Sequence, residues 1–166
     1  MVSGDPKSQL KTLSKKGKYA LRALYHLTRE HGRGPVLIAT LAQQESIPHK
    51  FLELILLHLK NNRLVDSKKG RNGGYFLAKE PNEITVGSVI RLIDGPLAPL
   101  PCASETAYRK CEECIDAQNC GTRIVMRRVR DAMAEILDHT TLADVCAEVD
   151  TRLKAGANAE ELMFYI

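Results

Sequence analysis

The chain has 166 residues, of which 44% are hydrophobic and 27% are charged, and its formal net charge is +4. This length suits one globular domain with an appendage, and the hydrophobic fraction is too high for a chain that is disordered throughout. No apolar run approaches the roughly 20 residues that cross a bilayer, and the segment 1–7 lacks the apolar core of a secretory signal. We therefore expect a cytoplasmic protein that does not enter the membrane.

The positive charge is confined to one half of the sequence. Residues 1–80 hold fifteen Lys or Arg against six Asp or Glu, whereas residues 81–166 hold nine against fourteen. A basic surface limited to one half favours contact with nucleic-acid phosphates, although solvated lysines on an ordinary surface give the same count.

The first half predicts three helices in a helix-turn-helix arrangement. Residues 15–30 carry apolar side chains at helical spacing, and the chain then continues into a second helix over 38–44 and a third over 49–62. The third helix leaves His49 and Lys50 exposed on its first turn, where a recognition helix enters the major groove. Its core-facing side chains are Leu52, Ile55, Leu56 and Leu59.

Two short strand patterns follow, over 64–69 and 74–78, and the Gly-Arg-Asn-Gly segment 70–73 joins them in a hairpin. The segment lacks the order of a phosphate-binding loop and precedes a strand, so nucleotide binding is not expected. We interpret the hairpin as a wing whose tip presents two cations and an amide to DNA: Lys69, Arg71 and Asn72.

The second half predicts a helix over 86–93 capped by Thr85, a longer helix over 122–139, and a last short helix over 141–149 before a frayed tail. The long helix carries one apolar stripe, which suits either packing within the chain or, as we favour, pairing with a second copy. A two-fold dimer predicts a palindromic DNA site. The stripe consists of Val125, Val129, Ala132, Met133 and Ile136.

Four of the five cysteines lie within nineteen residues. In a reducing compartment, such a group is more typical of metal ligands or a redox sensor than of disulfides. Only one C-x-x-C pair is present and no histidine lies nearby, which favours an iron–sulfur cluster over structural zinc, with a metal-free thiol switch or no role as alternatives. The candidate ligands are Cys102, Cys111, Cys114 and Cys120, whereas Cys146 is expected to be a buried helical residue.

No catalytic constellation is found. The five histidines are scattered and none has the H-E-x-x-H spacing of a hydrolytic metal site. A thiol oxidoreductase that uses Cys111 and Cys114 is the enzyme alternative, but a redox C-x-x-C opens a helix after a strand, whereas this pair follows prolines in a loop. We expect no enzymatic activity.

With these residues in place, the chain resembles the IscR and NsrR type of bacterial regulator, the Rrf2 family, over roughly residues 12–146. The resemblance rests on several short segments: Leu13-Ser14, Gly17 to Arg22, Ile47-Pro48, Phe51 to Glu53, Leu59, Leu64-Val65, Gly70 to Tyr75, Ile84 to Val86, and Thr141 to Asp144. It implies a mainly α fold with a small β wing, a winged helix-turn-helix domain and a long C-terminal dimerisation helix.

By position, the resemblance implies a DNA-binding domain over 12–95, a cluster-binding loop over 96–121, dimerisation and short C-terminal helices over 122–150, and a tail over 151–166. It implies a homodimeric repressor of transcription that binds double-stranded DNA under the control of a [2Fe–2S] or [4Fe–4S] cluster. The chemistry of the cysteines leaves zinc as the alternative occupant. The DNA-contacting residues that it implies are Lys50 with its neighbour His49, and the wing residues Lys69, Arg71 and Asn72. From their positive charge near the first helix, Lys15 and Lys18 are added as expected phosphate contacts.

The chain departs from both branches at the fourth cluster ligand. The IscR branch has a histidine three residues after the last cysteine, where this chain has Arg123, and the NsrR branch has an aspartate where this chain has Lys18. Ligation by all four clustered cysteines is the solution that we prefer.

Overall fold

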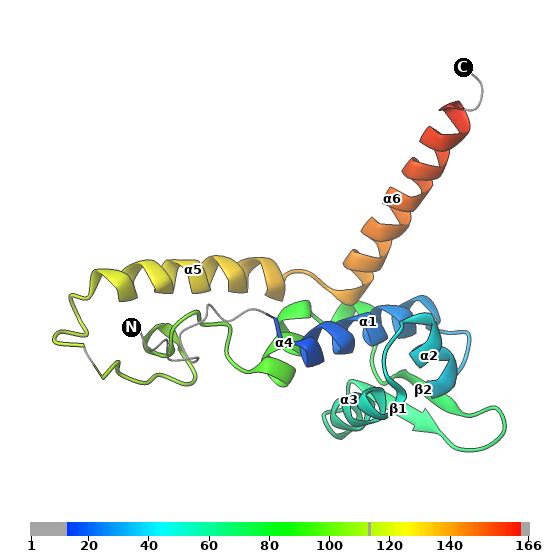
Figure 1. Cartoon of the computed structure of the whole chain (residues 1–166), viewed down its shortest axis with the longest axis horizontal. Coiled ribbons are helices and arrows are strands. Elements are labelled where there is room, and N and C mark those ends of the chain that lie inside the picture. The colour runs from blue at the N-terminus through cyan, green and yellow to red at the C-terminus, as the bar shows by residue number, and fades with distance from the viewer. Residues whose placement is uncertain (1–12, 113, 164–166) are drawn as a thin grey trace, which may run out of the picture.

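The computed structural model describes residues 13–112 and 114–163; Thr12, the expected start of the DNA-binding domain, lies outside them. Within these residues the fold is mainly helical with one small antiparallel sheet, as the sequence predicted (Figure 1). In chain order the elements are α1 (Lys15–Arg29), α2 (Ile38–Gln44), α3 (His49–Asn61), β1 (Val65–Lys68), β2 (Gly74–Leu77), η1 (Pro81–Glu83), α4 (Val86–Asp94), η2 (Pro101–Ala103), α5 (Gly121–Asp138) and α6 (Leu142–Met163).

Helix α1 begins at a side-chain cap and buries one face. The Ser14 hydroxyl accepts a hydrogen bond from the Gly17 amide at 2.9 Å, which satisfies a donor that the first helical turn otherwise leaves free. The helix ends before Gly32, whose φ of 79° is readily adopted by glycine. Its buried residues are Gly17, Ala20, Leu21, Ala23, Leu24 and Leu27, at the spacing that the sequence predicted.

Helices α2 and α3 form the predicted helix-turn-helix. Ser46 adopts a φ of 49° in the turn, and the next residue, Ile47, is buried. Pro48 then caps α3, where its missing N–H is not needed. The four α3 residues predicted to face the core are all fully buried, namely Leu52, Ile55, Leu56 and Leu59.

Strands β1 and β2 form the predicted wing, with Val65 opposite Leu77 and Lys68 opposite Gly74. Glycine is required at the return of the hairpin, because a Cβ at Gly73 would lie 2.2 Å from the Lys68 carbonyl oxygen. Val36 extends the sheet through two backbone hydrogen bonds with Tyr75, each 2.8 Å long. The base of the wing is therefore tied to the segment between α1 and α2.

Helix α4 joins the winged module (residues 13–94) to the rest of the chain. The Thr85 hydroxyl caps it, as predicted, by accepting from the Ser88 amide at 3.2 Å. At its other end, Asp94 accepts hydrogen bonds from the Ser14 amide (2.9 Å) and hydroxyl. The Nη1 and Nη2 groups of Arg91 donate to the two carboxylate oxygens of Asp138 at the end of α5. Helix α4 is therefore bound both to the start of α1 and to the end of α5.

The hydrophobic core lies inside the winged module. It is formed by α1, α2, α3, the wing strands and α4. Among the described residues beyond 94, Leu142 at the start of α6 belongs to this core, and Leu137 and Val145 pack against it. Backbone hydrogen bonds from Leu142 to Ile84 and from Val86 to Thr140, both 2.9 Å, hold the α5–α6 junction against this core. Burying a large aliphatic side chain is worth about 1.5–3 kcal/mol, so this core is the main source of stability.

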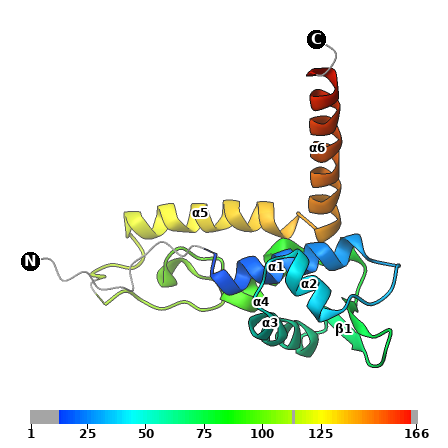
Figure 2. The same cartoon turned by 45° about the vertical axis from the view of Figure 1, so that its right-hand side comes forward.

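Helix α5 lies along the side of the molecule opposite α3 and the wing, and α6 projects away from it (Figures 1 and 2). Its bounds agree with the predicted 122–139 within one residue at each end. The apolar stripe (Val125, Val129, Ala132, Met133 and Ile136) is largely uncovered in the single chain: Ile136 is 66% exposed and Val125 51%.

The sequence predicted a short helix over 141–149 and a tail over 151–166. The predicted end of the helix is wrong, because α6 continues to Met163. The start is as predicted, with the Thr141 hydroxyl accepting from the Asp144 amide at 3.1 Å. Beyond Asp150 the chain lacks a clear apolar period, but it is rich in Ala, Glu, Lys and Arg, which favour helix intrinsically. The intrinsic helix propensity of these residues, rather than an apolar periodicity, explains why α6 continues beyond Asp150.

Candidate nucleic-acid interface and cysteine loop

The first turn of α3 is exposed, as predicted for a recognition helix. The imidazole of His49 lies 3.5 Å from the Glu53 carboxylate, one turn along the same helix. Lys50 is exposed, and within the described part of the chain its ammonium group has no ion-pair partner. A lysine so placed can donate hydrogen bonds to phosphate oxygens or to a guanine edge.

The tip of the wing presents the three predicted polar side chains. Lys69, Arg71 and Asn72 are exposed, and no described residue forms a side-chain hydrogen bond or ion pair with them. Gly70 supports the bend with a φ of 109°. The donors of the tip are therefore available to an external acceptor such as a phosphate.

The predicted lysines of α1 lie close to the recognition helix. The ammonium of Lys15 lies 5.7 Å from the centre of the Tyr19 ring, and Tyr19 packs edge-on against Phe51 of α3 at 5.7 Å between ring centres. Lys18 is exposed on the same helix. These contacts bring Lys15 near the first turn of α3, whereas the wing tip extends separately beyond the sheet (Figure 2).

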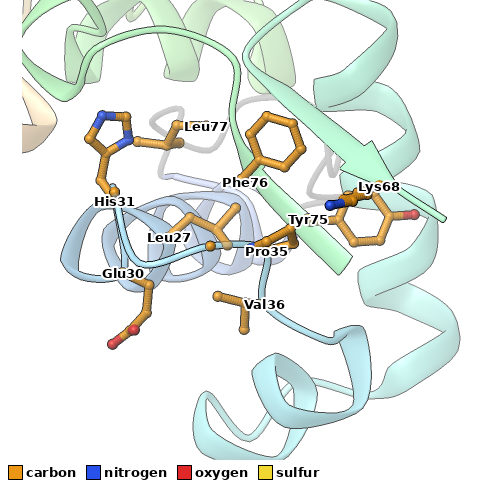
Figure 3. A pocket seen from close by; sticks show the side chains of 11 residues that line it. Leu27, Glu30, His31, Pro35, Val36, Lys68, Tyr75, Phe76 and Leu77 are labelled. Carbon is orange, nitrogen blue, oxygen red and sulfur yellow. The ribbon is translucent and has the colours of Figure 1, made fainter. Parts of the chain in front are cut away.

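A cavity that the sequence did not predict lies at the base of the wing. It has a volume of about 340 Å³ and lies between β2 and the loop after α1 (Figure 3). Leu27, Val36, Phe76 and Leu77 contribute apolar side chains, and His31 at its edge lies 3.3 Å from the Glu80 carboxylate. The cavity arises because the 31–36 segment crosses the sheet, a tertiary contact that no local pattern reports.

The cysteine loop (residues 102–120) lies at the end of the molecule opposite the wing (Figure 1). Burial raises the pKa of the Cys102 thiol above its ordinary value, and a hydrogen bond with the Cys111 thiol raises that pKa further. Burial also raises the pKa of Cys114, and the neighbouring Cys120 and Cys111 add to the increase. Neighbouring thiols in the loop therefore influence one another.

The four thiols adjoin one another as two pairs, Cys102 with Cys111 and Cys114 with Cys120. Across the described ranges, no three His, Cys, Asp or Glu side chains are assembled in a metal-binding geometry. An interaction between neighbouring thiols needs only pairwise proximity, whereas a metal needs at least three sulfurs aimed at one point. The described cysteines therefore lie in neighbouring pairs without a common metal-binding geometry.

Backbone turns shape the loop around these thiols. The Cys114 amide donates to the Cys111 carbonyl at 3.2 Å, which closes the C-x-x-C turn. The Asp116 carboxylate accepts from the Gln118 amide (2.8 Å) and the Asn119 amide (3.2 Å), which sets the turn before Cys120. Cys120 then precedes α5 as its N-terminal flanking residue.

Two arginines of α5 bind the loop, and the sequence analysis missed their role. Arg123 donates to the carbonyls of Cys102 (2.9 Å) and Ala117 (2.8 Å), and Arg130 donates to the carbonyl of Ala103 (2.8 Å). The side chain of Arg130 is only 9% exposed and lies 3.1 Å from the Glu105 carboxylate. The spacing of seven residues between Arg123 and Arg130, which places both on one helix face, was the available signal.

Residues 13–148 match the sequence profile of the Rrf2 family, which is described as "Iron-dependent Transcriptional regulator". A Rhodobacter capsulatus protein named as an rrf2-like HTH-type transcriptional regulator is 40% identical over 138 residues, which cover 81% of this chain and 92% of that protein. The HTH-type transcriptional regulator CymR of Bacillus subtilis is 34% identical over 93% of this chain and 99% of its own length. This chain belongs to the Rrf2 family.

Solved structures agree with this assignment to the Rrf2 family. The structure titled as CymR, the global cysteine regulator of B. subtilis, has a TM-score of 0.69 at 35% identity and covers 83% of this chain and 98% of that chain. The T. potens IscR structure has a TM-score of 0.66 at 29% identity over 84% and 88% of the two chains. The predicted resemblance and winged-helix fold are confirmed.

The Rrf2-family relatives are named as transcriptional regulators and not as enzymes, in agreement with the expectation that this chain catalyses no reaction. Among the described helices, none combines the length and the apolar character needed to cross a bilayer. Cys146 is buried, as expected, and its thiol donates to the Tyr25 carbonyl at 3.6 Å. The individual DNA-contacting and metal-ligating residues remain predictions for this Rrf2 chain.

Proposed function

We propose that this Rrf2-family regulator is a homodimeric repressor that binds a palindromic double-stranded DNA site, and that an iron–sulfur cluster held by its four clustered cysteines modulates DNA binding. The observation that supports the proposal is that Cys102 adjoins Cys111 and Cys114 adjoins Cys120 in one loop that α5 holds. A protein that acts on bacterial DNA works in the cytoplasm, which is the location we infer.

The proposed DNA surface combines α3, the wing tip and the start of α1. The exposure of its side chains and the positive charge of the first eighty residues support it. Phosphate contacts from lysines and Arg71 fix the position on DNA, and the first turn of α3 reads base edges. The residues assigned to this surface are Lys15, Lys18, His49, Lys50, Lys69, Arg71 and Asn72.

The proposed dimer forms through the apolar stripe of α5. A contiguous apolar face on an 18-residue helix, with Ile136 66% exposed, is unfavourable in water and is stabilised by a second copy. A two-fold axis beside α5 relates two copies of α3, so that a palindromic site with half-sites about one DNA turn apart is the geometric expectation.

The proposed sensory site fits a thiophilic metal centre by the chemistry of its donors. The pKa values of the Cys102 and Cys114 thiols are raised by burial and, further, by the neighbouring thiols, so neither loses its proton readily without a compensating positive charge. A bound cationic centre supplies the compensating positive charge, and sulfur-only ligation suits an iron–sulfur cluster and also zinc. The residues that hold it are Cys102, Cys111, Cys114 and Cys120, and the family description as iron-dependent favours iron.

A metal-free thiol switch is the second candidate, and the pairing of the thiols favours it. Cys102 adjoins Cys111 and Cys114 adjoins Cys120, so an oxidant such as a peroxide can take two electrons from each pair. Each pair would lose two protons and form one disulfide, while the peroxide would be reduced to water. Such a bridge shortens the loop without any metal.

Anaerobic purification with analysis of iron, sulfide and zinc per chain distinguishes these candidates. The proposal predicts iron and sulfide in comparable amounts and visible absorption, both lost when any one of the four cysteines is replaced by serine. Cys146→Ser is the matched control, because Cys146 lies away from the loop, and this variant should keep the cluster. Zinc without iron would support a structural site, and no metal with reversible disulfides would support the thiol switch. If all four serine variants kept the metal content of the wild-type protein, a role for these cysteines as ligands would be contradicted.

A further inference from the structure

Arg123 occupies a special position in the cysteine loop because one guanidinium binds both ends of it. Its Nε donates to the Cys102 carbonyl at 2.9 Å, and its Nη1 donates to the Ala117 carbonyl at 2.8 Å. The guanidinium also lies 5.3 Å from the centre of the Tyr108 ring, within the range of a cation–π contact. One side chain in the first turn of α5 thus contacts the beginning, the middle and the end of the loop.

These contacts matter because the loop has little apolar packing of its own. From Glu105 to Lys110 every residue is exposed, and Ile115 is 100% exposed. The carbonyls of Cys102 and Ala117 are fifteen positions apart in sequence, and Cys111 and Cys114 lie between them. Closing a flexible segment of this length costs conformational entropy, which the two hydrogen bonds of Arg123 offset.

Arg130 extends the same arrangement two helical turns further along α5. It donates to the Ala103 carbonyl at 2.8 Å and pairs with Glu105 at 3.1 Å. The beginning of the loop is therefore bound to α5 at two points, Cys102 through Arg123 and Ala103 through Arg130. The apolar stripe runs along another face of the same helix.

We propose that Arg123 is a positioning residue of the thiol cluster: it fixes the distance between Cys102 and the Cys111–Cys120 segment and fastens both to α5. The inference rests on the proposed function for its role in sensing, but the geometry itself does not require a metal. A guanidinium stays protonated and has no free lone pair, so Arg123 does not ligate a metal. It stands where the IscR branch carries a histidine ligand, and it orders the four cysteines instead.

Arg127 provides a matched control. It lies one turn after Arg123 and lines the same cavity of about 220 Å³ beside Cys102, together with Tyr108 and Arg130. Among the residues that the structure describes, none accepts a hydrogen bond from its guanidinium group. Arg127→Gln therefore removes the same charge from the same cavity without releasing the loop, and Arg123→Gln removes the charge together with both hydrogen bonds.

The first test measures Cys102 in reduced, metal-free protein by iodoacetamide labelling and mass spectrometry. Cys102 is only 5% exposed, so labelling of the wild-type protein is slow. Arg123→Gln should label Cys102 about tenfold faster, because two hydrogen bonds that close the loop are lost. Arg123→Lys, which keeps the charge but lacks the planar fork that directs donors to two carbonyls at once, should lie between, and Arg127→Gln should stay within about twofold of wild type. Equal rates for Arg123→Gln and Arg127→Gln would overturn the proposal.

The second test uses Co²⁺ as the probe, because thiolate ligation of cobalt gives a strong visible spectrum. Arg123→Gln should weaken Co²⁺ binding about tenfold relative to Arg127→Gln, with partial recovery in Arg123→Lys. Unchanged cobalt affinity in Arg123→Gln would also overturn the positioning role. If wild-type protein binds neither cobalt nor iron, the metal-sensing function fails, and the labelling rates of Cys102 still decide the role of Arg123. Circular dichroism of each variant checks that the winged module is folded.

Discussion

The winged module surrounds a core in which residues such as Leu24, Leu52 and Leu56 have no exposed surface. The cysteine loop is built differently: among its described residues only Cys102, Ala103 and Ser104 are buried, and arginine side chains bind its backbone. A region held by a hydrophobic core keeps its shape in any solution that keeps it folded. A region held by a few polar contacts and adjacent thiols responds to metal, oxidation and the position of α5. This contrast suits a regulator in which one part reads DNA and another part changes state.

The largest expected effect comes from breaking the core of the winged module. Leu56→Ala should lower the free energy of unfolding by about 3 kcal/mol, because it removes a fully buried side chain and leaves a cavity. Ile115→Ala, in the cysteine loop, is the matched control and should stay within about 0.5 kcal/mol of wild type. Urea unfolding of the metal-free protein measures both, and similar losses in the two variants would contradict the contrast between the regions.

The apolar stripe of α5 gives the next largest effect. Ile136→Asp should raise the dimer dissociation constant about thirtyfold, because it places a carboxylate in the proposed interface while leaving the fold of one chain intact. Sedimentation equilibrium measures the constant. Leu153→Asp makes the same change at a residue of α6 that is similarly exposed, and it should leave the dimer unaffected. A dimer equally stable in both variants would exclude α5 as the contact.

A substitution in the wing tests DNA binding independently of the cysteine loop. Arg71→Ala should weaken DNA binding about threefold to tenfold and reduce the slope of log affinity against log salt by about one, since one phosphate contact is lost. Metal content should not change, because the wing lies at the other end of the molecule (Figure 1). Arg152→Ala on α6 is the control of equal charge. A salt slope identical to that of wild type would remove the wing from the DNA surface.

The smallest effect is expected at the contact between the two regions. Arg91 holds the pKa of the Asp138 carboxyl below its usual value. At pH values above the unfolded pKa of about 4, the ion pair therefore stabilises the folded state. This stabilisation is lost as the pH falls through the lowered pKa of the folded state. Both side chains are more than a third exposed, so screening limits the contribution to about 0.5 kcal/mol.

Asp138→Asn therefore should be less stable than wild type by about 0.5 kcal/mol at pH 7, and the difference should shrink as the pH falls below about 4. Urea unfolding at several pH values measures it. A difference that is the same at pH 7 and pH 3 would show that the charge of Asp138 is not the cause.

Local patterns were sufficient to predict most of the winged module. Helical spacing predicted the burial of Leu52 and Leu59, the Gly-rich segment predicted the wing, and Thr85 was identified as a cap. The length of α6 was wrong because intrinsic propensity extends that helix where periodicity ends.

The cysteine loop was predictable only in part. Cysteine spacing predicted a single four-cysteine site, whereas the described residues show the thiols adjoining in two pairs, with no three metal-binding side chains assembled. The pairing of the thiols and the arginine contacts depend on how the backbone passes α5, and guanidinium-to-carbonyl bonds leave no periodic trace. Arg130, for example, is buried and donates to the Ala103 carbonyl, a contact that the sequence did not indicate.

The most direct test of the account is a DNA-binding titration of the anaerobically purified protein with its cluster and after removal of the cluster. The DNA is selected from a random-sequence pool with both forms of the protein. The account predicts that affinity for the selected palindrome differs by at least about tenfold between the two forms, and that the difference disappears when Cys102 is replaced by serine. Equal affinities for both forms would contradict the claim that the cysteine loop controls DNA binding.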